Sequence, residues 1–379
     1  MDDALARRVA ELQAAGHEIG MLSDIELWWR DHQEWLAEKG YMLRPRYKPG
    51  WKPSWVGRMK KYQYPEDFED RHRPNLIDVL DATRVSDNGL VALKRVKKKI
   101  SPHEIEMAQY LYSEPLRSDP RNHTVPILEI LPVPDDPEVT LMVMPLLRSC
   151  DDPDFYTLGE AMSFLAQVFE GLQYMHELHV AHRDAKGGNI MYDPRPLFPD
   201  MYHPVETYKR RDWKGRAKYS TRTKCPVRYY FIDFGLSRRY DPKDGPPREH
   251  PVIGGDKTVP EFKNWNGQLL DPFPTDIYYI GNMIRRTLLA PYKGLDFLAP
   301  LVKDMIQADP AQRPTAQEVT RRFEELLKPL SQWKLRSRLV PVQEDSLYKL
   351  FRNIRYPFRT LRYVLTRKPA IPPTPPPSF

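Results

Sequence analysis

The hydrophobic residues near the start of the chain follow a helical pattern. Ser23 and Glu26 have the spacing of a capping box, in which a Ser hydroxyl and a Glu carboxylate satisfy each other's free backbone amides. They predict a helix that begins there and stops near Gly40. Five of the eight tryptophans lie within residues 28–55. We expect their rings to pack this segment onto the main domain, and a docking surface is the alternative.

Strands replace the helical pattern from about Leu76 onward. An Asn-Gly pair accepts the positive φ angles of a tight turn, so Asn88 and Gly89 predict a hairpin between their two apolar flanks. One helix and two more strands should follow, before a mainly helical portion that opens with an apolar stripe from Met162 to Met175. The expected segments are strands at 79–85, 90–96, 125–131 and 139–144 and a helix around 104–111.

The composition is that of a globular chain. Of the 379 residues, 41% are hydrophobic and 29% are charged, and the net charge is +7, which excludes disorder for most of the chain. No run of 18 apolar residues occurs, so we expect no transmembrane segment. The acidic start Met1-Asp2-Asp3 argues against a secretory signal. Two cysteines, Cys150 and Cys225, make no disulfide framework, so we expect an intracellular protein, cytoplasmic or nuclear.

Positive charge is concentrated in two blocks. Residues 331–379 hold ten Lys and Arg against two acids, and residues 209–228 hold nine against Asp212. Such blocks are usually solvated surface; the alternative is an anionic partner, which for the basic tail would be a membrane surface, RNA or an acidic protein. Residues 351–359 alternate cations with aromatics, and we expect Pro357 to interrupt any long helix there. Six prolines in residues 369–379 predict an extended, unpacked end.

Four short motifs that carry chemistry occur in a fixed order. The first, Val91-Ala92-Leu93-Lys94, places a lysine at the end of an apolar strand, where burial is costly unless an anion or carboxylate meets it. The other three are His182-Arg183-Asp184-Ala185-Lys186-Gly187-Gly188-Asn189, Phe231-Ile232-Asp233-Phe234-Gly235 and Thr258-Val259-Pro260-Glu261.

This order of motifs resembles the eukaryotic protein kinase catalytic domain, whose signature is a strand lysine, His-Arg-Asp, Asp-Phe-Gly and Ala-Pro-Glu. Residues 274–281 and 308–315 are similar to later segments of the same family. The resemblance implies an α+β, bilobal protein-kinase-like fold, with a small, mainly antiparallel β N-lobe that contains one helix and a larger helical C-lobe. The Trp-Trp-Arg-Asp and Trp-Lys-Pro-Ser-Trp stretches make the chain similar to uncharacterised fungal kinase-domain proteins.

Domain boundaries follow from the resemblance. We expect a Trp-rich N-terminal extension at 1–75, a kinase-like domain at 76–330 and a basic, Pro-rich C-terminal tail at 331–379. The N-lobe would span 76–147 and the C-lobe 148–330. The 43 residues between Asn189 and Asp233 predict an insertion at 194–226. A disordered surface loop is its simplest interpretation, and recruitment of an acidic substrate or occlusion of the site is the alternative.

The resemblance implies that ATP and Mg2+ are the cofactors and that protein Ser or Thr hydroxyls are the substrates. Asp184 would accept or orient the proton of the attacking hydroxyl, and Lys186, typical of Ser/Thr kinases, would steady the γ-phosphate. Asn189 and Asp233 would supply oxygens to the metal. Lys94 would hold the α- and β-phosphates, paired with Glu104 in preference to Glu106. The hinge that meets adenine would be Met144, Pro145, Leu146 and Leu147.

Further roles are structural by the same resemblance. Glu261 and Arg313 would form an ion pair, and Asp276 would anchor the catalytic-loop backbone. Arg183 resembles the arginine that reads a phosphorylated activation segment, yet Ser237, Tyr240 and Thr258 are the only hydroxyl groups from Leu236 to Thr258. We therefore expect no phosphorylation control.

The chain departs from the family pattern at the phosphate-covering loop. No glycine occurs between Gly57 and Gly89, whereas the family uses Gly-x-Gly-x-x-Gly so that the backbone can approach the phosphates closely. The short segment between Lys94 and Glu104 also predicts a truncated or reoriented helix. An active protein kinase is favoured because the metal and base residues are retained. A pseudokinase scaffold and a small-molecule kinase on the same fold are the alternatives.

Overall fold

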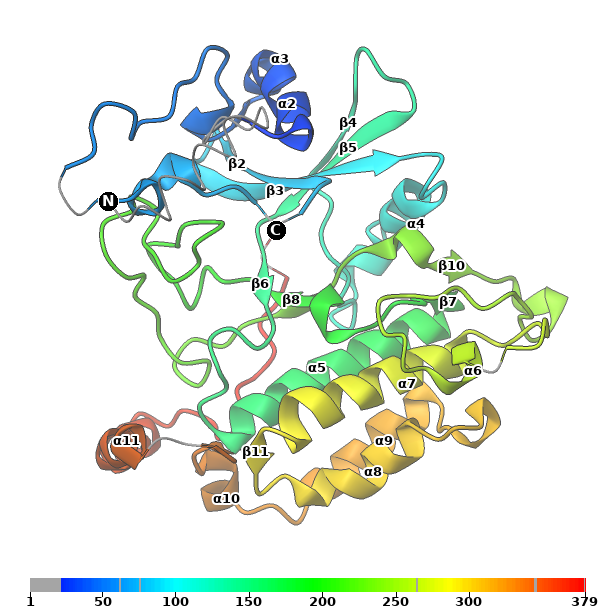
Figure 1. Cartoon of the computed structure of the whole chain (residues 1–379). Helices are drawn as coiled ribbons and strands as arrows, with labels where there is room; N and C mark the ends of the chain where they lie inside the picture. Colours follow the sequence, from blue (N-terminus) through cyan, green and yellow to red (C-terminus); the bar gives the residue numbers. More distant parts are fainter. Residues whose placement is uncertain (1–21, 61–62, 75, 264, 344–345, 378) are drawn as a thin grey trace. The chain divides into compact units, whose positions relative to one another are not determined.

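A computed structural model describes residues 22–60, 63–74, 76–263, 265–343, 346–377 and 379. Within this part, the side chains of residues 346–355 are not described. The acidic start at Met1 also lies outside the described residues. The chain divides into two compact units (Figure 1). Unit 1 comprises residues up to Arg95 together with 200–217, and unit 2 comprises 96–199 together with 218–379. The predicted boundaries at 75 and 330 remain predictions.

Unit 1 contains an antiparallel sheet segment built from β1 (Tyr41–Met42), β2 (Val79–Arg84) and β3 (Gly89–Lys97), the last of which continues into unit 2. Tyr41 pairs with Arg84, and Val79 pairs with Lys94. Asn88 has a φ of +59°, which confirms the expected tight turn. The strand β1 was not expected, because two residues carry no readable alternation.

The Trp-rich segment packs within unit 1. Helix α2 (Asp24–Asp31) begins directly after Ser23, whose N–H donates to Glu26 Oε2 at 3.0 Å, so the capping box is confirmed. The single helix expected to reach Gly40 is split at His32, and α3 (Gln33–Glu38) follows. Trp29 and Trp55 are buried, and the guanidinium of Arg95 lies 4.6 Å from the Trp28 ring centroid. The interpretation of these rings as packing residues is therefore confirmed.

A buried ion pair joins α2 to the turn η1 (Pro45–Tyr47). Arg46 donates through Nε to Glu26 Oε1 at 2.6 Å and through Nη2 to Glu26 Oε2 at 3.1 Å. Burial raises the pKa of Glu26, but the hydrogen bonds from Arg46 and Ser23 outweigh burial and leave that pKa below its usual value. The carboxylate is thus held ionised inside unit 1.

The connection from β1 to β2 spans residues 43–78 and includes η1, η2 (Pro65–Asp67) and η3 (Glu69–Arg71). It stands where the family has a short glycine-rich hairpin. Arg44 ties it to the sheet, since its Nε lies 3.0 Å from Asp81 Oδ2 and its Nη1 lies 3.2 Å from Glu69 Oε1. Side-chain ion pairs therefore fix this segment where the family relies on bare backbone.

The insertion is packed, so its interpretation as a disordered loop is wrong. Its unit 1 part, residues 200–217, brings His203 Nε2 to 2.9 Å from Glu69 Oε1. Trp213 Nε1 donates to Asp67 O at 2.7 Å, and Arg211 Nη2 donates to Thr83 Oγ1 at 2.8 Å. His203 and Trp213 of the insertion thus bind a carboxylate and a backbone carbonyl of the β1–β2 connection, which composition alone did not reveal.

Unit 2 begins with helix α4 (Glu104–Leu111), which is as short as expected. A hairpin of β4 (Glu129–Pro132) and β5 (Val139–Pro145) follows. A small sheet pairs β6 (Arg148–Ser149) with β8 (Ile190–Tyr192) and β8 with β9 (Tyr229–Phe231). The expected apolar stripe is confirmed as the buried helix α5 (Leu158–Glu177).

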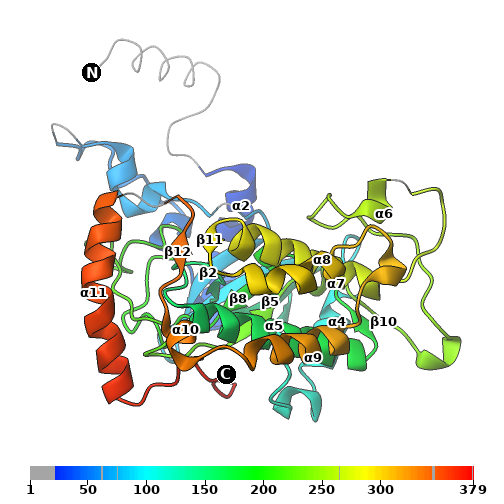
Figure 2. The same ribbon diagram turned by 90° about the horizontal axis from the view of Figure 1, so that it is seen from below.

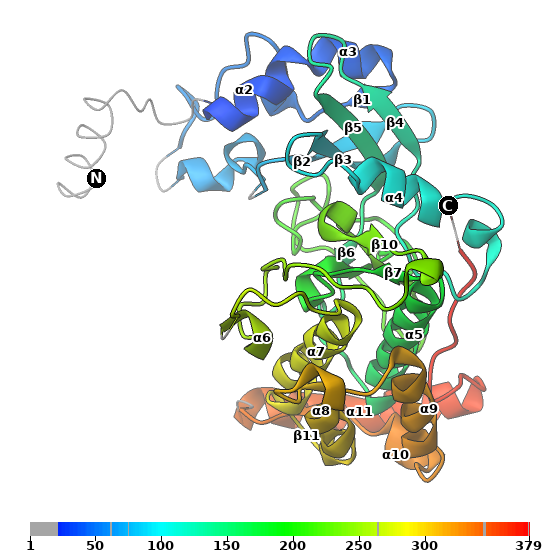
Figure 3. The same cartoon turned by 90° about the vertical axis from the view of Figure 1, so that its right-hand side faces the viewer.

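Helices α5, α7, α8 and α9 form the layered portion of unit 2 (Figures 1 and 3). The remaining helices, strands and turns have these bounds: η4 Leu116–Ser118, β7 Val180–Ala181, η5 Gly187–Asn189, η6 Phe234–Leu236, β10 Arg238–Arg239, η7 Pro242–Asp244, α6 Pro260–Lys263, α7 Phe273–Ile284, η8 Arg285–Leu289, β11 Tyr292–Lys293, η9 Asp296–Leu298, α8 Ala299–Met305, η10 Pro310–Gln312, α9 Ala316–Leu327, α10 Gln332–Arg336, β12 Val340–Pro341 and α11 Ser346–Leu365.

The C-terminal segment differs from both expectations. Helix α11 runs through Pro357, although proline removes one helical hydrogen bond (Figure 2). Contacts on either side of the proline hold the helix, including Tyr356 Oη to Arg336 O at 2.8 Å. The end of the chain is extended but packed, because Ser163 Oγ donates to Pro372 O at 2.7 Å and Arg228 Nη1 donates to Pro375 O at 2.9 Å.

Among the described helices, none is both long and apolar enough to cross a bilayer. The prediction that no transmembrane segment occurs is consistent with this finding.

Candidate active site

The catalytic-loop motif lies directly after β7. Asp276, on α7, accepts the backbone N–H groups of His182 and Arg183, each at 2.7 Å. His182 also places Nε2 3.1 Å from Ile232 O, just before the Asp-Phe-Gly motif. The anchoring role expected for Asp276 is confirmed, because one fully buried carboxylate fixes two consecutive peptide groups.

Asp184, Lys186 and Asn189 come together at one carboxylate. Lys186 Nζ lies 2.5 Å from Asp184 Oδ2, and Asn189 Nδ2 donates to the same oxygen at 2.9 Å. The side chain of Asp184 is 7% exposed and that of Lys186 is 34% exposed, so the ammonium reaches toward solvent while the carboxylate is held. These donors fix the orientation of a carboxylate that is itself buried.

Two glycines of the activation segment contact this cluster, and sequence reasoning missed them. Gly255 N–H donates to Asp184 Oδ1 at 2.7 Å. A Cβ on Gly254 would lie 2.5 Å from Asp184 Oδ1 and 2.6 Å from the Tyr279 hydroxyl. The adjacent Gly-Gly pair, in an otherwise polar segment, was the signal that a backbone approaches another group closely here.

Two carboxylates gather around the glycine of the Asp-Phe-Gly motif. A Cβ on Gly235 would lie 3.2 Å from Glu104 Oε2 and 3.5 Å from Asp233 Oδ1. Glu104 is buried, whereas Glu106 has a side chain that is 84% exposed. Glu104 is thus the buried acid of α4, and its predicted pairing with Lys94, in preference to Glu106, remains a prediction. Asp233 itself has a φ of +65°, a left-handed conformation uncommon for aspartate.

Asp233 and Asn189 carry the carboxylate and amide oxygens that Mg2+ prefers. Within the described residues, no group of three His, Cys, Asp or Glu side chains could hold a metal ion. Magnesium is usually held by one or two carboxylates, water and substrate phosphates. Because the amide nitrogen of Asn189 donates to Asp184, its carbonyl oxygen is directed elsewhere, as a metal ligand requires.

Two groups of predicted nucleotide contacts lie on strands. Lys94 lies on β3, within unit 1, and its Cα pairs with Val79 in the antiparallel register. Met144 and Pro145 end β5 in unit 2, and Leu146 and Leu147 follow. Met144 and Leu147 are buried, each 8% exposed. Their roles toward ATP remain predictions.

Arg183 is paired with an acid of the activation segment. Its Nη2 lies 3.1 Å from Glu249 Oε2, and the Arg183 side chain is 7% exposed. Glu249 also pairs its backbone with Leu270. A resident carboxylate thus meets the arginine that a phosphate would otherwise meet, and sequence reasoning had not singled out Glu249.

The ion pair predicted between Glu261 and Arg313 is present. Arg313 contacts Glu261 through Nη1 at 2.8 Å and Nη2 at 2.7 Å, and the two side chains are 0% and 6% exposed. This buried, bidentate pair confirms the expectation and joins α6 to the segment between η10 and α9.

Comparisons with known proteins agree with these contacts. Residues 77–250 match the family described as the protein kinase domain. Over 117 residues, the chain is 27% identical to the cell cycle protein kinase spo4 of Schizosaccharomyces pombe. The aligned part makes up 30% of this chain and 26% of that protein. Over 197 residues, it is 25% identical to a protein of Acanthamoeba polyphaga mimivirus named "Putative serine/threonine-protein kinase R436". The aligned part makes up 46% of this chain and 59% of that protein.

Residues 77–250 are therefore similar to a eukaryotic protein kinase domain, and this similarity is consistent with the expected α+β, bilobal protein-kinase-like fold. The matches span only part of each relative's length, about a quarter of one and three fifths of the other. The similarity to fungal kinase-domain proteins remains a prediction. Of these two relatives, one comes from a yeast and the other from a virus.

Replacing Gly254 by alanine should disturb the Asp184 cluster. The added Cβ would meet the Asp184 carboxylate at 2.5 Å, so either that carboxylate or the activation segment must move. Because a displacement of about 1 Å can cost about a hundredfold in rate, we expect ATP turnover to fall by at least tenfold. Gly188→Ala is the matched control, since its Cβ would meet only Lys186 Cε at 3.8 Å. Equal losses in both variants would contradict the expectation.

Proposed function

We propose that this protein transfers the γ-phosphoryl group of ATP to Ser or Thr hydroxyls of protein substrates, with Mg2+ as the metal. The observation that carries the proposal is the cluster in which Lys186 and Asn189 both donate to the Asp184 carboxylate. Phosphoryl transfer asks the protein for positioning and for cations near a developing negative charge. An oriented carboxylate beside an ammonium supplies both.

The residues of the cluster have separable tasks. A carboxylate offers about four acceptor sites, and Asp184 uses three of them for Lys186, Asn189 and Gly255. A substrate hydroxyl can still donate to the remaining site, where Asp184 would hold or accept its proton. The Lys186 ammonium would then face the transferred phosphate. Bound Mg2+ supplies charge neutralisation of the phosphates, and Asp233 and Asn189 are the residues that would hold it.

Specificity for Ser and Thr rests on Lys186, which resembles the lysine of Ser/Thr-type kinases. The name of the mimivirus relative also refers to serine and threonine. A small-molecule kinase on the same fold remains an alternative, and the retained His-Arg-Asp-x-Lys loop favours protein substrates over it.

A pseudokinase scaffold is the second candidate, and one observation favours it. The β1–β2 connection is a long segment fixed by Arg44 ion pairs, so unit 1 lacks the glycine-rich hairpin among its described residues. Backbone amides that would cover phosphates are then replaced by side chains. In this alternative the motif residues are kept for folding, and nucleotide affinity is weak.

We propose that phosphorylation of the activation segment does not regulate this protein. Ser237 is 1% exposed and donates to His182 O at 3.0 Å, so a protein kinase cannot reach its hydroxyl in this conformation. The Arg183–Glu249 pair already neutralises the arginine that would read a phosphate. We propose that the activation segment is ordered without modification.

A thermal-shift measurement tests nucleotide binding without knowledge of the substrate. Ligand at 100 times its dissociation constant stabilises a protein by about 2.7 kcal/mol, so ATP with Mg2+ should raise Tm by a few degrees. Asp233→Asn should abolish the Mg2+-dependent part of this shift, and Lys94→Ala should weaken the shift as a whole.

The control variant is Asp200→Asn, which changes an exposed aspartate that belongs to none of the motifs and should keep the full shift. A Mg2+-dependent shift that survives in Asp233→Asn would overturn the metal assignment. No shift at millimolar ATP would favour the scaffold.

Two further proposals concern the partner of the basic tail and the location of the protein in the cell. We propose an anionic partner for the basic tail, namely a membrane surface, RNA or an acidic protein, because ten cations lie in residues 331–379. We also propose an intracellular location. It is supported by two free thiols, of which Cys150 is buried, and burial raises the pKa of that thiol to about 12.

A further inference from the structure

Helix α11 presents three different faces along its described half. One face is packed: Tyr363 is 8% exposed, and its hydroxyl lies 2.6 Å from Thr221 Oγ1. Tyr356 is on the same side, and its ring centroid lies 6.3 Å from that of Tyr156. Thr360 is also buried. Residues spaced by three and four share one side of a helix, so these contacts fix which way the rest of α11 faces.

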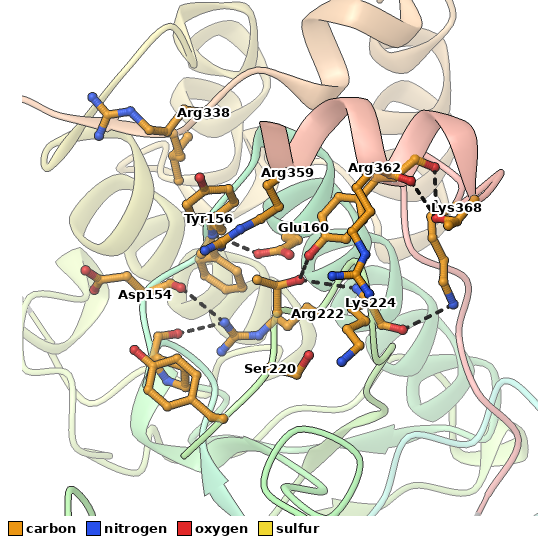
Figure 4. A pocket seen from close by; sticks show the side chains of 17 residues that line it. Asp154, Tyr156, Glu160, Ser220, Arg222, Lys224, Arg338, Arg359, Arg362 and Lys368 are labelled. Atoms are coloured by element: carbon orange, nitrogen blue, oxygen red, sulfur yellow. Dashed lines mark hydrogen bonds between the residues drawn. The ribbon is translucent and has the colours of Figure 1, made fainter. Parts of the chain in front are cut away.

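The second face is cationic and borders a cavity of about 690 Å³ (Figure 4). The Arg359 guanidinium lies over the Tyr156 ring at 4.3 Å, and Arg362 follows it along the helix. The insertion contributes Lys224 to the same wall, and Lys368 Nζ donates to Lys224 O at 3.3 Å. In the described part of the chain, Arg359, Arg362 and Lys224 form no ion pair with a carboxylate.

The two acids that line this cavity are Asp154 and Glu160, and among the described residues neither forms an ion pair with Arg359, Arg362 or Lys224. Asp154 is exposed. Glu160 is buried, and its Oε1 already accepts two hydrogen bonds from Thr223, each at 2.8 Å. Arg222, also buried, is committed to the carbonyls of Pro153 and Cys150. The wall formed by α11 and Lys224 therefore keeps a net positive charge that faces outward.

The third face is apolar and exposed. Phe358 is 73% exposed, Leu361 is 56% exposed and Leu365 is 73% exposed. Their spacing of three and four places them on one side of α11, next to the cationic face and away from Tyr363. Large apolar side chains exposed together on one helix face mark an interaction surface, unlike apolar residues scattered singly.

We propose that α11 binds the surface of a membrane that carries anionic headgroups. Phe358, Leu361 and Leu365 would enter the boundary between headgroups and acyl chains, while Arg359 and Arg362 would meet the phosphates. An interfacial helix has this order of faces, with an apolar side flanked by Lys and Arg. This inference rests on the proposed anionic partner of the tail and makes no use of the kinase activity.

The arrangement favours a membrane over the other anionic partners. RNA and acidic proteins would use the cations, but neither explains why three large apolar side chains stand exposed beside them. A second copy of the chain would cover the apolar face, but it would bring Arg359 and Arg362 against the same cations of its partner. An anionic bilayer satisfies both faces at once.

Vesicle sedimentation of the full chain tests the proposal. The protein should sediment with phosphatidylcholine vesicles that contain phosphatidylserine, and much less with pure phosphatidylcholine. Because each cation near an anionic surface contributes about 1 kcal/mol, Arg359→Gln combined with Arg362→Gln should weaken the partition about thirtyfold at low salt. Phe358→Ser, Leu361→Ser and Leu365→Ser together should weaken it at least about a hundredfold.

Matched controls lie on two other helices of unit 2. Trp333→Ser removes a side chain that is 71% exposed on α10, and Lys303→Gln removes an exposed cation on α8. Both should bind vesicles like the unchanged protein, and an unchanged Tm should accompany all variants, since every substituted side chain is outside the packed face.

Three results would overturn the proposal, and each points to a different partner. Binding of an RNA oligonucleotide with no vesicle binding would retain an anionic partner but reject the membrane. Saturable binding of soluble inositol hexakisphosphate, with no loss in the apolar triple variant, would assign the cavity to a free phosphate ligand. A dimer that the triple variant dissociates would assign the apolar face to a second copy. No anion binding at all would reject the tail proposal and leave the kinase proposal untouched.

Discussion

Replacement of Asp184 by asparagine should lower ATP turnover by a factor of about 10² to 10⁴, the usual contribution of a positioned general base. Asparagine has nearly the same shape and can still accept a hydrogen bond from Gly255, but it cannot take the proton of an attacking hydroxyl. The Lys186 ammonium also loses the charge that it contacts at 2.5 Å. Initial rates of ATP consumption, measured with the unchanged protein in parallel, give the ratio.

Nucleotide affinity separates a chemical effect from a folding effect in this variant. The thermal shift with ATP should persist in Asp184→Asn, because the proposed nucleotide and metal contacts are Lys94, Asn189 and Asp233. Asp200→Asn provides the control for removal of a carboxylate. Turnover in Asp184→Asn equal to that of the unchanged protein would refute Asp184 as the base. Absence of turnover in both would favour the pseudokinase scaffold.

Replacement of Arg46 by methionine should destabilise unit 1 by about 3–5 kcal/mol, because it leaves the buried Glu26 carboxylate without its partner. Arg46 also donates to Asp70 O at 2.7 Å, so the change detaches η1 from both α2 and η3. Urea unfolding followed by tryptophan fluorescence measures the loss, since most of the tryptophans lie in this unit.

The matched control is Arg30→Met, which removes an ion pair with Asp31 whose side chains are 37% and 55% exposed. We expect a change within about 1 kcal/mol for such an exposed pair. Combining Arg46→Met with Glu26→Gln should recover part of the loss, because the buried charge is then removed. A loss of similar size in Arg30→Met would contradict the buried-pair explanation.

The same pair gives the pH dependence a defined direction. The pKa of Glu26 is lowered in the folded protein, so the stability that its ionised form contributes is present above the ordinary value of 4.5. That contribution is lost as the pH falls through the folded pKa. The Arg46→Met variant should therefore lose less stability than the unchanged protein between neutral and acidic pH.

Local signals in the sequence predicted local structure well. The capping box at Ser23 and the turn at Asn88 were readable because each depends on residues a few positions apart. The anchoring of the catalytic loop by Asp276 was predicted through family motifs, since no spacing rule relates residues about 90 apart. The helix through Pro357 was not predictable, because its stability comes from packing against Tyr156 and Arg336.

The candidate site was predicted in its side chains and missed in its backbone. Asp184, Lys186 and Asn189 were named from motif order alone. The contribution of Gly255 is a peptide N–H, which every residue except proline has, so residue type does not reveal it. Glu249 escaped notice for a related reason, because an exposed-looking acid in a polar segment shows no pattern until Arg183 is placed beside it.

The discontinuity of unit 1 has a consequence for how the chain folds during synthesis. His203 and Glu69 are separated by 134 residues, and the unit is complete only when residues 200–217 are available. Much of unit 2, including α5 and the catalytic loop, is translated before that point. The N-terminal part must therefore wait on the ribosome without the contacts of His203 to Glu69 and of Trp213 to Asp67. Contacts so distant in sequence are slow to form. We expect nascent chains to be most open to proteases and chaperones during this interval.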